Sequence, residues 1–341
     1  MGKNLGLGLI GLGRLGSSYA KYLTGRIAGA RLVAVSDVNE AAAVSLTAQL
    51  GISKRYSRYQ DLIADEEVEA VVIVSPTSTH KEIVLEAAKY DKAIFCEKPL
   101  SISLAEARAM HRAVEQAGVF FQMGFMRRFD KGYVAAKRKI EEGAIGTPVV
   151  FKSSSRDPNR PSLEYLDPTH SGGLLVDCGI HDFDLARWFM GDIASVYSIG
   201  GTLAYPEMKE IGDIDNAITS LYFLSGALGV IDLSRNGVYG YDIRTEILGT
   251  EGTIKIGYLR ETPILVMTKE GICHDTVPYF TERFEQAYIT QLQDFVENVL
   301  RSKPPAVSCA DGVAALQASA AATLSFNENR PVRIQETSSP I

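Results

Sequence analysis

Short apolar runs alternate with amphipathic segments over roughly the first 120 residues of the chain. The runs that predict β-strands are Leu5–Ile10, Leu32–Ser36, Ala70–Ser75, Ala93–Cys96 and Val119–Met123. The segments that predict helices are Arg14–Thr24, Glu40–Leu50, His80–Lys89 and Leu104–Ala117. Because strands that alternate with helices are joined by crossover connections, this pattern predicts an α/β domain with a parallel sheet.

The pattern changes near Arg127. Helices are predicted over Tyr133–Glu142, Glu282–Leu300 and Gly312–Phe326. Between the first two of these lie strand-like runs separated by turn residues: Val149–Ser153, Ser195–Ile199, Ala217–Phe223, Leu228–Leu233, Ile243–Leu248, Thr253–Ile256 and Ile264–Met267. Strands that follow one another across short glycine-containing turns favour an antiparallel sheet. We therefore expect one domain over residues 1–126, a second over 127–335, and a loose tail over 336–341.

Composition narrows the classes of protein. A chain of 341 residues with 46% hydrophobic and 22% charged residues is typical of a globular protein of two domains. The net charge of −6 argues against a nucleic-acid partner, and no apolar run is long enough for a membrane span. The start of the chain shows no signal-peptide core, and four widely spaced cysteines indicate neither a disulfide framework nor a thiolate metal site. We expect a cytoplasmic protein.

A glycine-rich turn follows the first predicted strand. Gly11-Leu12-Gly13-Arg14-Leu15-Gly16 fits G-x-G-x-x-G between a strand and a helix, the context in which this motif binds a dinucleotide. Gly11 permits the tight turn, Gly13 lets the backbone approach a pyrophosphate, and Gly16 allows close packing. Asp37 ends the second strand and can bind the ribose hydroxyls while repelling a 2′-phosphate. The sequence predicts NAD as cofactor, with NADP less favoured.

Two further strand ends carry polar residues. Ser75-Pro76-Thr77-Ser78-Thr79-His80 follows the third strand, and these residues either line the nicotinamide side or only cap the next helix. Glu97-Lys98-Pro99 ends the fourth strand. Because ligands bind at the carboxyl ends of strands in open α/β sheets, Lys98 is expected to point at the bound molecules.

An acid and an imidazole stand four residues apart in the second half of the chain. Asp177 and His181 share one face if the segment is a single helix, so the carboxylate can orient the imidazole as a general base. The same spacing can serve half of a metal site, but no second cluster completes one, and we expect no metal. Nearby polar side chains suit a polyhydroxylated ligand: Arg127, Asp157, Asn159, Tyr239, Tyr241, Arg283 and Tyr288.

With these motifs together, the chain resembles the glucose–fructose oxidoreductase/inositol dehydrogenase (Gfo/Idh/MocA) family, and within it the inositol 2-dehydrogenases. The likeness to the latter is carried by the stretches Gly124–Tyr133 and Tyr239-Gly240-Tyr241-Asp242. One departure stands out, because inositol dehydrogenases tend to read His-Arg-Asn-Pro where this chain has Ser155-Arg156-Asp157-Pro158. The change leaves open which polyol the site accepts.

The resemblance implies a Rossmann domain joined to an α+β domain with an open, mostly antiparallel sheet, assembled into dimers or tetramers. It implies NAD-dependent oxidation of a secondary hydroxyl of a cyclic polyol (inositol) to the ketone, with Lys98, Asp177 and His181 as catalytic residues. The expected cofactor-binding residues are Gly11, Gly13, Arg14, Leu15, Asp37, Ser75, Thr77, His80, Glu97 and Lys98. The expected substrate-binding residues are Lys98, Arg127, Asp157, Asp177, His181, Tyr241 and Tyr288.

Two alternatives stay open. The same residues can serve a dehydrogenase or reductase of an aldose or anhydro-sugar. A non-catalytic NAD-binding regulatory protein on the same fold is the alternative outside enzymes, although such a protein has no need of a proton-transfer set. The sequence also leaves open whether Lys98 or His181 is the main acid or base, since a desolvated lysine can lose its proton.

Overall fold

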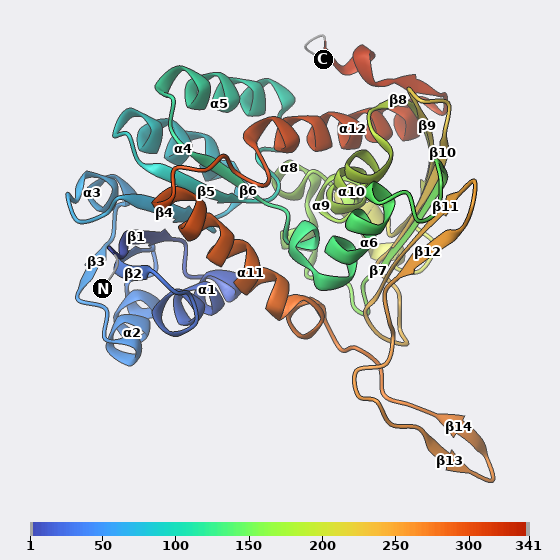
Figure 1. Ribbon diagram of the computed structural model, residues 1–341, viewed down its shortest axis with the longest axis horizontal. Helices are drawn as coiled ribbons and strands as arrows, with labels where there is room; N and C mark the ends of the chain where they lie inside the picture. The colour runs from blue at the N-terminus through green and yellow to red at the C-terminus, as the bar shows by residue number, and fades with distance from the viewer. Residues whose placement is uncertain (1–2, 339–341) are drawn as a thin grey trace. The chain divides into compact units, whose positions relative to one another are not determined.

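A computed structural model describes residues 3–338 of the chain (Figure 1). These residues form two compact units. The first contains the chain up to Met126 together with Tyr288–Ala314, and the second contains Arg127–Ala287 together with the chain from Ala315 onward. The first unit is therefore not confined to the expected residues 1–126, because Tyr288–Ala314 returns to it. Of the expected tail, residues 336–338 belong to the 3₁₀ helix η4 (Ile334–Ser338), and residues 339–341 lie outside the described part.

The first unit is built on a parallel sheet. Its strands are β1 (Leu5–Ile10), β2 (Ala30–Ser36), β3 (Lys54–Tyr56), β4 (Ala70–Ile73), β5 (Ala93–Glu97) and β6 (Phe121–Gly124). The strand order is β3-β2-β1-β4-β5-β6, and every neighbouring pair is parallel. Chain order reverses between β1 and β4, which is where open α/β sheets bind their ligands.

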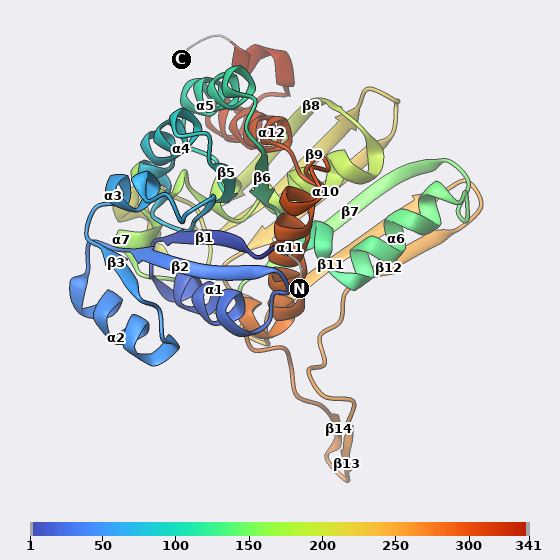
Figure 2. The same ribbon diagram turned by 60° about the vertical axis from the view of Figure 1, so that its left-hand side comes forward.

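Helices cover both faces of this sheet. They are α1 (Arg14–Gly25), α2 (Glu40–Leu50), α3 (Tyr59–Ala64), α4 (His80–Lys89) and α5 (Leu104–Ala117), with the 3₁₀ turn η1 (Thr77–Thr79) before α4. In Figures 1 and 2, α1 and α2 lie on one face while α4 and α5 lie on the other. Covering both faces explains why β1, β4 and β5 are buried throughout and read as continuous apolar runs. The predicted Rossmann-like domain is confirmed.

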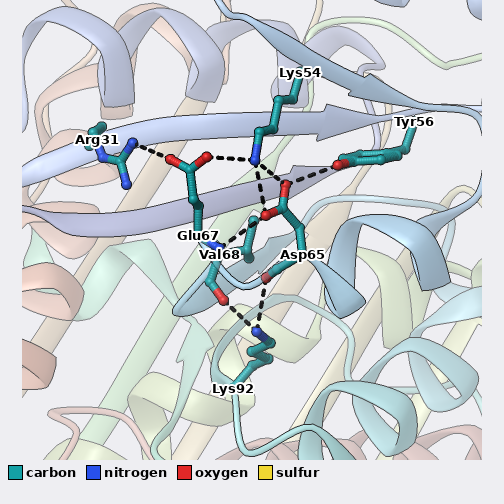
Figure 3. A network of polar contacts seen from close by, with 7 residues as sticks. All are labelled: Arg31, Lys54, Tyr56, Asp65, Glu67, Val68 and Lys92. Atoms are coloured by element: carbon teal, nitrogen blue, oxygen red, sulfur yellow. Dashed lines mark hydrogen bonds and ion pairs between the residues drawn. The ribbon is translucent and has the colours of Figure 1, made fainter.

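β3 and α3 were not predicted from the sequence, because both are short and partly polar. A network of ion pairs holds this edge of the sheet (Figure 3). Lys54 of β3 contacts Asp65 and Glu67 at 2.8 and 2.7 Å, and Glu67 in turn pairs with Arg31 at 2.8 Å. Tyr56 donates to Asp65 at 2.9 Å. Polar contacts therefore attach the edge strand β3 to its neighbours, since β3 has little apolar surface of its own.

The second unit is built on a larger, mixed sheet. Its strands are β7 (Pro148–Arg156), β8 (Ile193–Gly201), β9 (Asn216–Phe223), β10 (Leu228–Ser234), β11 (Asp242–Gly249), β12 (Thr253–Ile256) and β15 (Val332–Arg333). The order is β12-β11-β7-β10-β9-β8-β15, in which β7 and β10 are parallel and the other neighbours antiparallel. This confirms the expected open, mostly antiparallel sheet. A hairpin of β13 (Val266–Thr268) and β14 (Gly271–Cys273) extends away from that sheet (Figure 1).

Helices α6 (Lys131–Glu141), α9 (Leu174–Asp177) and α10 (Ile180–Met190) contact strands of this second sheet. The shorter helical segments of the unit are η2 (Met126–Phe129), α7 (Leu163–Leu166), α8 (Pro168–Ser171) and η3 (Pro206–Ile211). The unit boundaries fall within α11 (Phe280–Leu300) and α12 (Cys309–Glu328). Burial alternates along β9, as a sheet covered on one face requires. Within residues 3–338, no helix combines the length and apolar character needed to cross a lipid bilayer.

The ion-pair network predicts a pH-dependent contribution to stability. Burial opposes ionisation of Asp65, but hydrogen bonds from Lys54, the Glu67 N–H and Tyr56 outweigh it and lower the pKa of Asp65 below its ordinary 3.8. A depressed carboxyl pKa stabilises the fold above the unfolded-state pKa, and this stabilisation is lost as the pH falls through the folded-state pKa. Asp65→Asn should therefore lower Tm at pH 7, and its difference from wild type should shrink below roughly pH 4.

Thermal unfolding between pH 3 and pH 8 measures this difference. The exposed Asp61 on α3 provides the matched control, since Asp61→Asn should change Tm little at any pH. An Asp65→Asn difference that stays constant down to pH 3 would contradict the assignment.

Candidate active site

The glycine turn adopts the close backbone contacts that its motif requires. Gly11 has a φ of +95°, and a Cβ at Gly16 would lie 2.0 Å from the Gly11 carbonyl oxygen. A Cβ on Gly13, by contrast, would meet nothing within 4 Å. Side chains are thus excluded at Gly11 and Gly16 by the protein itself, whereas Gly13 borders open space.

The residues of this turn fit a dinucleotide. Helix α1 begins at Arg14 with no side-chain cap and no acid in its first turn, which suits an anion at a helix N-terminus. The carboxylate of Asp37 lies beside the turn, where Oδ2 accepts from the Leu12 N–H at 2.6 Å. Its Oδ1 accepts from the Asn39 N–H at 2.7 Å. A fixed carboxylate at this position suits ribose hydroxyls and disfavours a 2′-phosphate.

His80 joins the loops that follow β4 and β5. It is buried, and its Nδ1 and Nε2 lie 2.9 and 3.0 Å from the carbonyl oxygens of Pro99 and Ser75. Burial lowers the pKa of His80, which favours the neutral ring. Ser75 and Thr79 are linked through their hydroxyls at 2.7 Å, and Thr77 opens η1 between them. These contacts fix the loop shape; direct cofactor contacts by Ser75, Thr77 and His80 stay predictions.

Lys98 follows β5 and is held by its neighbour Glu97. The Lys98 N–H donates to Oε2 of Glu97 at 3.1 Å. Oε1 of Glu97 accepts from the Tyr19 hydroxyl, and from Nε2 of Gln291 at 3.3 Å. Burial raises the pKa of Glu97, although these hydrogen bonds oppose the rise. The buried carboxylate of Glu97 thus fixes the backbone at Lys98, and direct cofactor contacts by Glu97 and Lys98 stay predictions.

Asp177 and His181 lie on two consecutive helices, so the expectation of a single helix is wrong. α9 ends at Asp177 and α10 begins at Ile180, with Cys178 and Gly179 between them. The N–H groups of Cys178 and Gly179 both donate to the Leu174 carbonyl at 3.1 Å. A Cβ on Gly179 would lie 2.5 Å from the Leu175 carbonyl and 3.0 Å from a Leu233 methyl. Tight packing against β10 therefore accounts for a glycine at the junction.

Asp177 and Asp157 both neighbour a buried arginine that the sequence analysis did not single out. Nη2 of Arg235 donates to Oδ2 of Asp177 at 3.2 Å, and Nη1 lies 3.9 Å from Oδ2 of Asp157. The thiol of Cys178 donates to Oδ2 of Asp157 at 3.3 Å. Arg235 had no sequence signal because it follows an ordinary strand and belongs to none of the motifs.

Arg127 lies inside the second unit in contact with an acid. Its Nη1 donates to Oδ1 of Asp182 at 3.0 Å and to the Ser155 hydroxyl at 3.1 Å. Ser155 donates to the same carboxylate at 2.7 Å. Ser155 is the first residue of the Ser-Arg-Asp-Pro stretch noted above, and its hydroxyl thus bonds to Arg127 and Asp182 within the protein. Substrate contact by Arg127 stays a prediction.

The two predicted tyrosines lie in different units. Tyr241 is buried in the second unit with its ring edge-to-face against Phe284, at 6.2 Å between centroids. Burial raises the pKa of Tyr241 well above its ordinary value, so the phenol is neutral. Tyr288 belongs to the first unit and packs against Tyr19 at 5.9 Å. Among the described residues, no group of three or more His, Cys, Asp or Glu side chains is arranged to hold a metal ion.

Comparison with known proteins identifies the family to which the chain belongs. Residues 5–125 match the family model described as the oxidoreductase family, NAD-binding Rossmann fold, and residues 137–334 match its C-terminal alpha/beta domain. The chain belongs to the Gfo/Idh/MocA oxidoreductase family. The family resemblance inferred from the motifs is confirmed, as is the expected NAD-dependent oxidoreductase class.

The Gfo/Idh/MocA relatives include inositol dehydrogenases matched over nearly their whole length. The chain is 43% identical to scyllo-inositol 2-dehydrogenase (NAD(+)) of Bacillus subtilis, covering 96% of this chain and 95% of that protein. It is 42% identical to myo-inositol 2-dehydrogenase of Thermotoga maritima, covering 97% and 98%. A crystal structure of scyllo-inositol dehydrogenase from Lactobacillus casei with bound NAD(H) and scyllo-inositol is 31% identical, with a TM-score of 0.93 and coverage of 97% and 99%.

The glycine turn of this Gfo/Idh/MocA protein gives a paired prediction. Gly13→Ala should leave Tm nearly unchanged, because its Cβ meets open space, but should weaken NADH binding at least tenfold where the backbone approaches the pyrophosphate. Gly16→Ala should lower Tm, because its Cβ collides with a main-chain oxygen. NADH fluorescence titration and thermal unfolding measure the two effects. Unchanged NADH affinity in stable Gly13→Ala protein would count against the site.

Proposed function

We propose that this chain is an NAD-dependent inositol 2-dehydrogenase that oxidises one secondary hydroxyl of a cyclic polyol to the ketone. The observation that carries the proposal is the near-full-length similarity to scyllo- and myo-inositol 2-dehydrogenases, in a chain that has Lys98, Asp177 and His181. The lysine and the acid–imidazole pair are the groups that such an oxidation needs for its proton.

Each of these residues has a distinct proposed role. His181 accepts the proton of the reacting hydroxyl on a ring nitrogen, and Asp177 orients the imidazole and stabilises its charged form. Lys98 donates a charged hydrogen bond to the same oxygen and stabilises the negative charge that develops there. Bound nicotinamide supplies the hydride acceptor. Anchoring of the Lys98 N–H by Glu97 supports a fixed position for the lysine backbone.

The choice of polyol follows from residues of the second unit. Arg127, Asp157 and Tyr241 are proposed to bind the ring hydroxyls. Ser155 and Asp157 depart from the pattern that the family resemblance leads us to expect. Both myo- and scyllo-inositol are therefore candidate substrates. A dehydrogenase or reductase of an aldose or anhydro-sugar is the alternative within enzymes, and a non-catalytic NAD-binding regulator is the alternative outside them.

We also propose that the protein is a cytoplasmic homo-oligomer, either a dimer or a tetramer. Exposed apolar residues pair across strands of the second sheet, with Ile199 opposite Ile218 and Tyr222 opposite Leu228. By the alternation along β9, they lie on the face that the helices leave uncovered (Figure 1). An apolar patch of this kind fits a second copy of the chain, as the family resemblance implies.

An assay with NAD and a panel of polyols tests the activity. We expect NADH formation with myo- or scyllo-inositol and at least tenfold lower kcat/KM with glucose, galactose and anhydro-sugars. A sugar as the preferred substrate would favour the enzymatic alternative. Tight NAD binding without turnover of any substrate would favour the regulator.

Substitution of the proposed proton-handling residues tests the mechanism. Lys98→Ala and His181→Ala should each lower kcat by about 10²- to 10⁴-fold while NADH binding and Tm are retained. His170→Ala is the matched control and should leave kcat unchanged, because His170 is an exposed histidine of the unit that contains His181. The assignment fails if both variants turn over at the wild-type rate.

The oligomer is tested by light scattering after size-exclusion chromatography. Ile218→Glu should shift the wild-type dimer or tetramer toward smaller species, because a charge would be buried at the interface. Val134→Glu on α6 is the control at an exposed apolar residue outside the sheet. A monomeric wild-type protein would contradict the proposed homo-oligomer.

A further inference from the structure

One buried guanidinium in the second unit lies among several acidic groups. Arg235 is 1% exposed and donates to Asp177 at 3.2 Å and to Sγ of Cys178 at 3.3 Å. Asp157 lies 3.9 Å from the same Nη1. Asp213 also acts electrostatically on Arg235. Arg235 thus contacts the proposed catalytic acid and lies close to its acidic neighbour Asp157.

The topology of the sheet explains why these residues meet. β7 and β10 are parallel, with Arg156 opposite Ser234, so both strands end at the same edge of the sheet. Asp157 follows β7 and Arg235 follows β10. The Asp157 N–H donates to the Ser234 carbonyl at 2.9 Å, which fixes the two strand ends side by side. The turn after α9 packs on β10 through Gly179 and Leu233, and this brings Asp177 to that edge.

Arg235 affects the charges of this cluster. Burial alone would lower the pKa of Arg235, but the negative charges of Asp177, Asp157 and Asp213 raise it, so the guanidinium is always charged. Burial raises the pKa of Asp213, and Arg235 opposes that rise. Without Arg235, the carboxylates would repel one another in a poorly solvated place. The carboxylates would then ionise less readily, because like charges in a buried place disfavour the charged form.

We propose that Arg235 is a positioning residue of the reaction, which fixes the carboxylate of Asp177 and keeps it ionised while Asp157 shares the same guanidinium. The inference rests on the proposed function, because Asp177 affects turnover through His181. It also gives Asp157 a physical role, because Asp157 brings a second negative charge close to Asp177 and Arg235 supplies the positive charge between them.

The pH profile of kcat/KM measures this role. Turnover needs Asp177 ionised and His181 neutral, so activity falls at low pH as the Asp177–His181 pair takes up a proton, and the acidic midpoint belongs to the pair. Replacing Arg235 by methionine removes a cation beside Asp177 and raises the apparent pKa of the pair. The acidic midpoint of Arg235→Met should therefore move upward by about one to three pH units, since an opposite charge at this range lowers a carboxyl pKa by that amount. A purely structural role would lower stability without moving the midpoint.

A second substitution checks that charge is the cause. Adding Asp157→Asn to Arg235→Met removes one of the repelling carboxylates, so the acidic midpoint should move back toward that of the wild type. The control is Arg128→Met, because Arg128 is also a largely buried arginine paired with an acid of α10, with Nε 2.9 Å from Oδ2 of Asp184. Arg128→Met should lower Tm and leave the midpoint unchanged.

Each result separates this inference from the function it rests on. No turnover of any polyol by the wild type refutes the proposed function itself. A wild type that is active, with a folded Arg235→Met variant that keeps the wild-type midpoint, refutes the role of Arg235 alone. If Arg235→Met does not fold, Arg235→Lys decides the matter. It keeps the charge but loses the forked geometry, so kcat should fall roughly 10- to 100-fold at an unchanged midpoint, and a wild-type kcat overturns the inference.

Discussion

One buried carboxylate, that of Glu97, holds the first unit together at the end of its sheet. It accepts hydrogen bonds from Tyr19 of α1, Gln291 of α11 and the main chain of Lys98. A Cβ on Gly124 of β6 would lie 2.8 Å from its carboxyl carbon, so the neighbouring strand must lack a side chain there. A buried carboxylate is costly unless it is satisfied in this way. The need to satisfy Glu97 therefore fixes both the returning helix and the backbone that presents Lys98.

Buried arginines impose a similar constraint on the second unit. Arg127 and Arg128 of η2 pair with Asp182 and Asp184 of α10, at the start of which His181 lies. Removing one partner from a buried pair leaves an uncompensated charge and typically costs 3–5 kcal/mol. These pairs fix the position of α10 relative to η2. Arg235 does the same for the end of α9, and so both ends of the Asp177–His181 segment are held by charge.

The two units hold Lys98 and Asp177, both proposed catalytic residues, by a common principle. Lys98 directly follows β5 and Asp177 ends α9, and each is fixed by a buried, oppositely charged or hydrogen-bonding neighbour. Groups that are fixed in this way need little reorganisation when a substrate binds. Neither Glu97 nor Arg235 is a group that needs to touch the substrate, yet Glu97 binds the main chain of Lys98 and Arg235 binds the carboxylate of Asp177.

The sequence by itself determined the fold class, the glycine turn and the residue types of the proposed site. Apolar runs and glycine spacing are local properties, because side-chain periodicity and backbone freedom depend on neighbouring residues. The tertiary structure alone decided that residues 288–314 return to the first unit, that α9 and α10 are separate, that Ser155 and Arg127 bond to Asp182, and that Arg235 accompanies Asp177. These contacts join residues as far as 272 positions apart, such as Tyr19 and Gln291. Burial of charge depends on such distant partners, which no local pattern records.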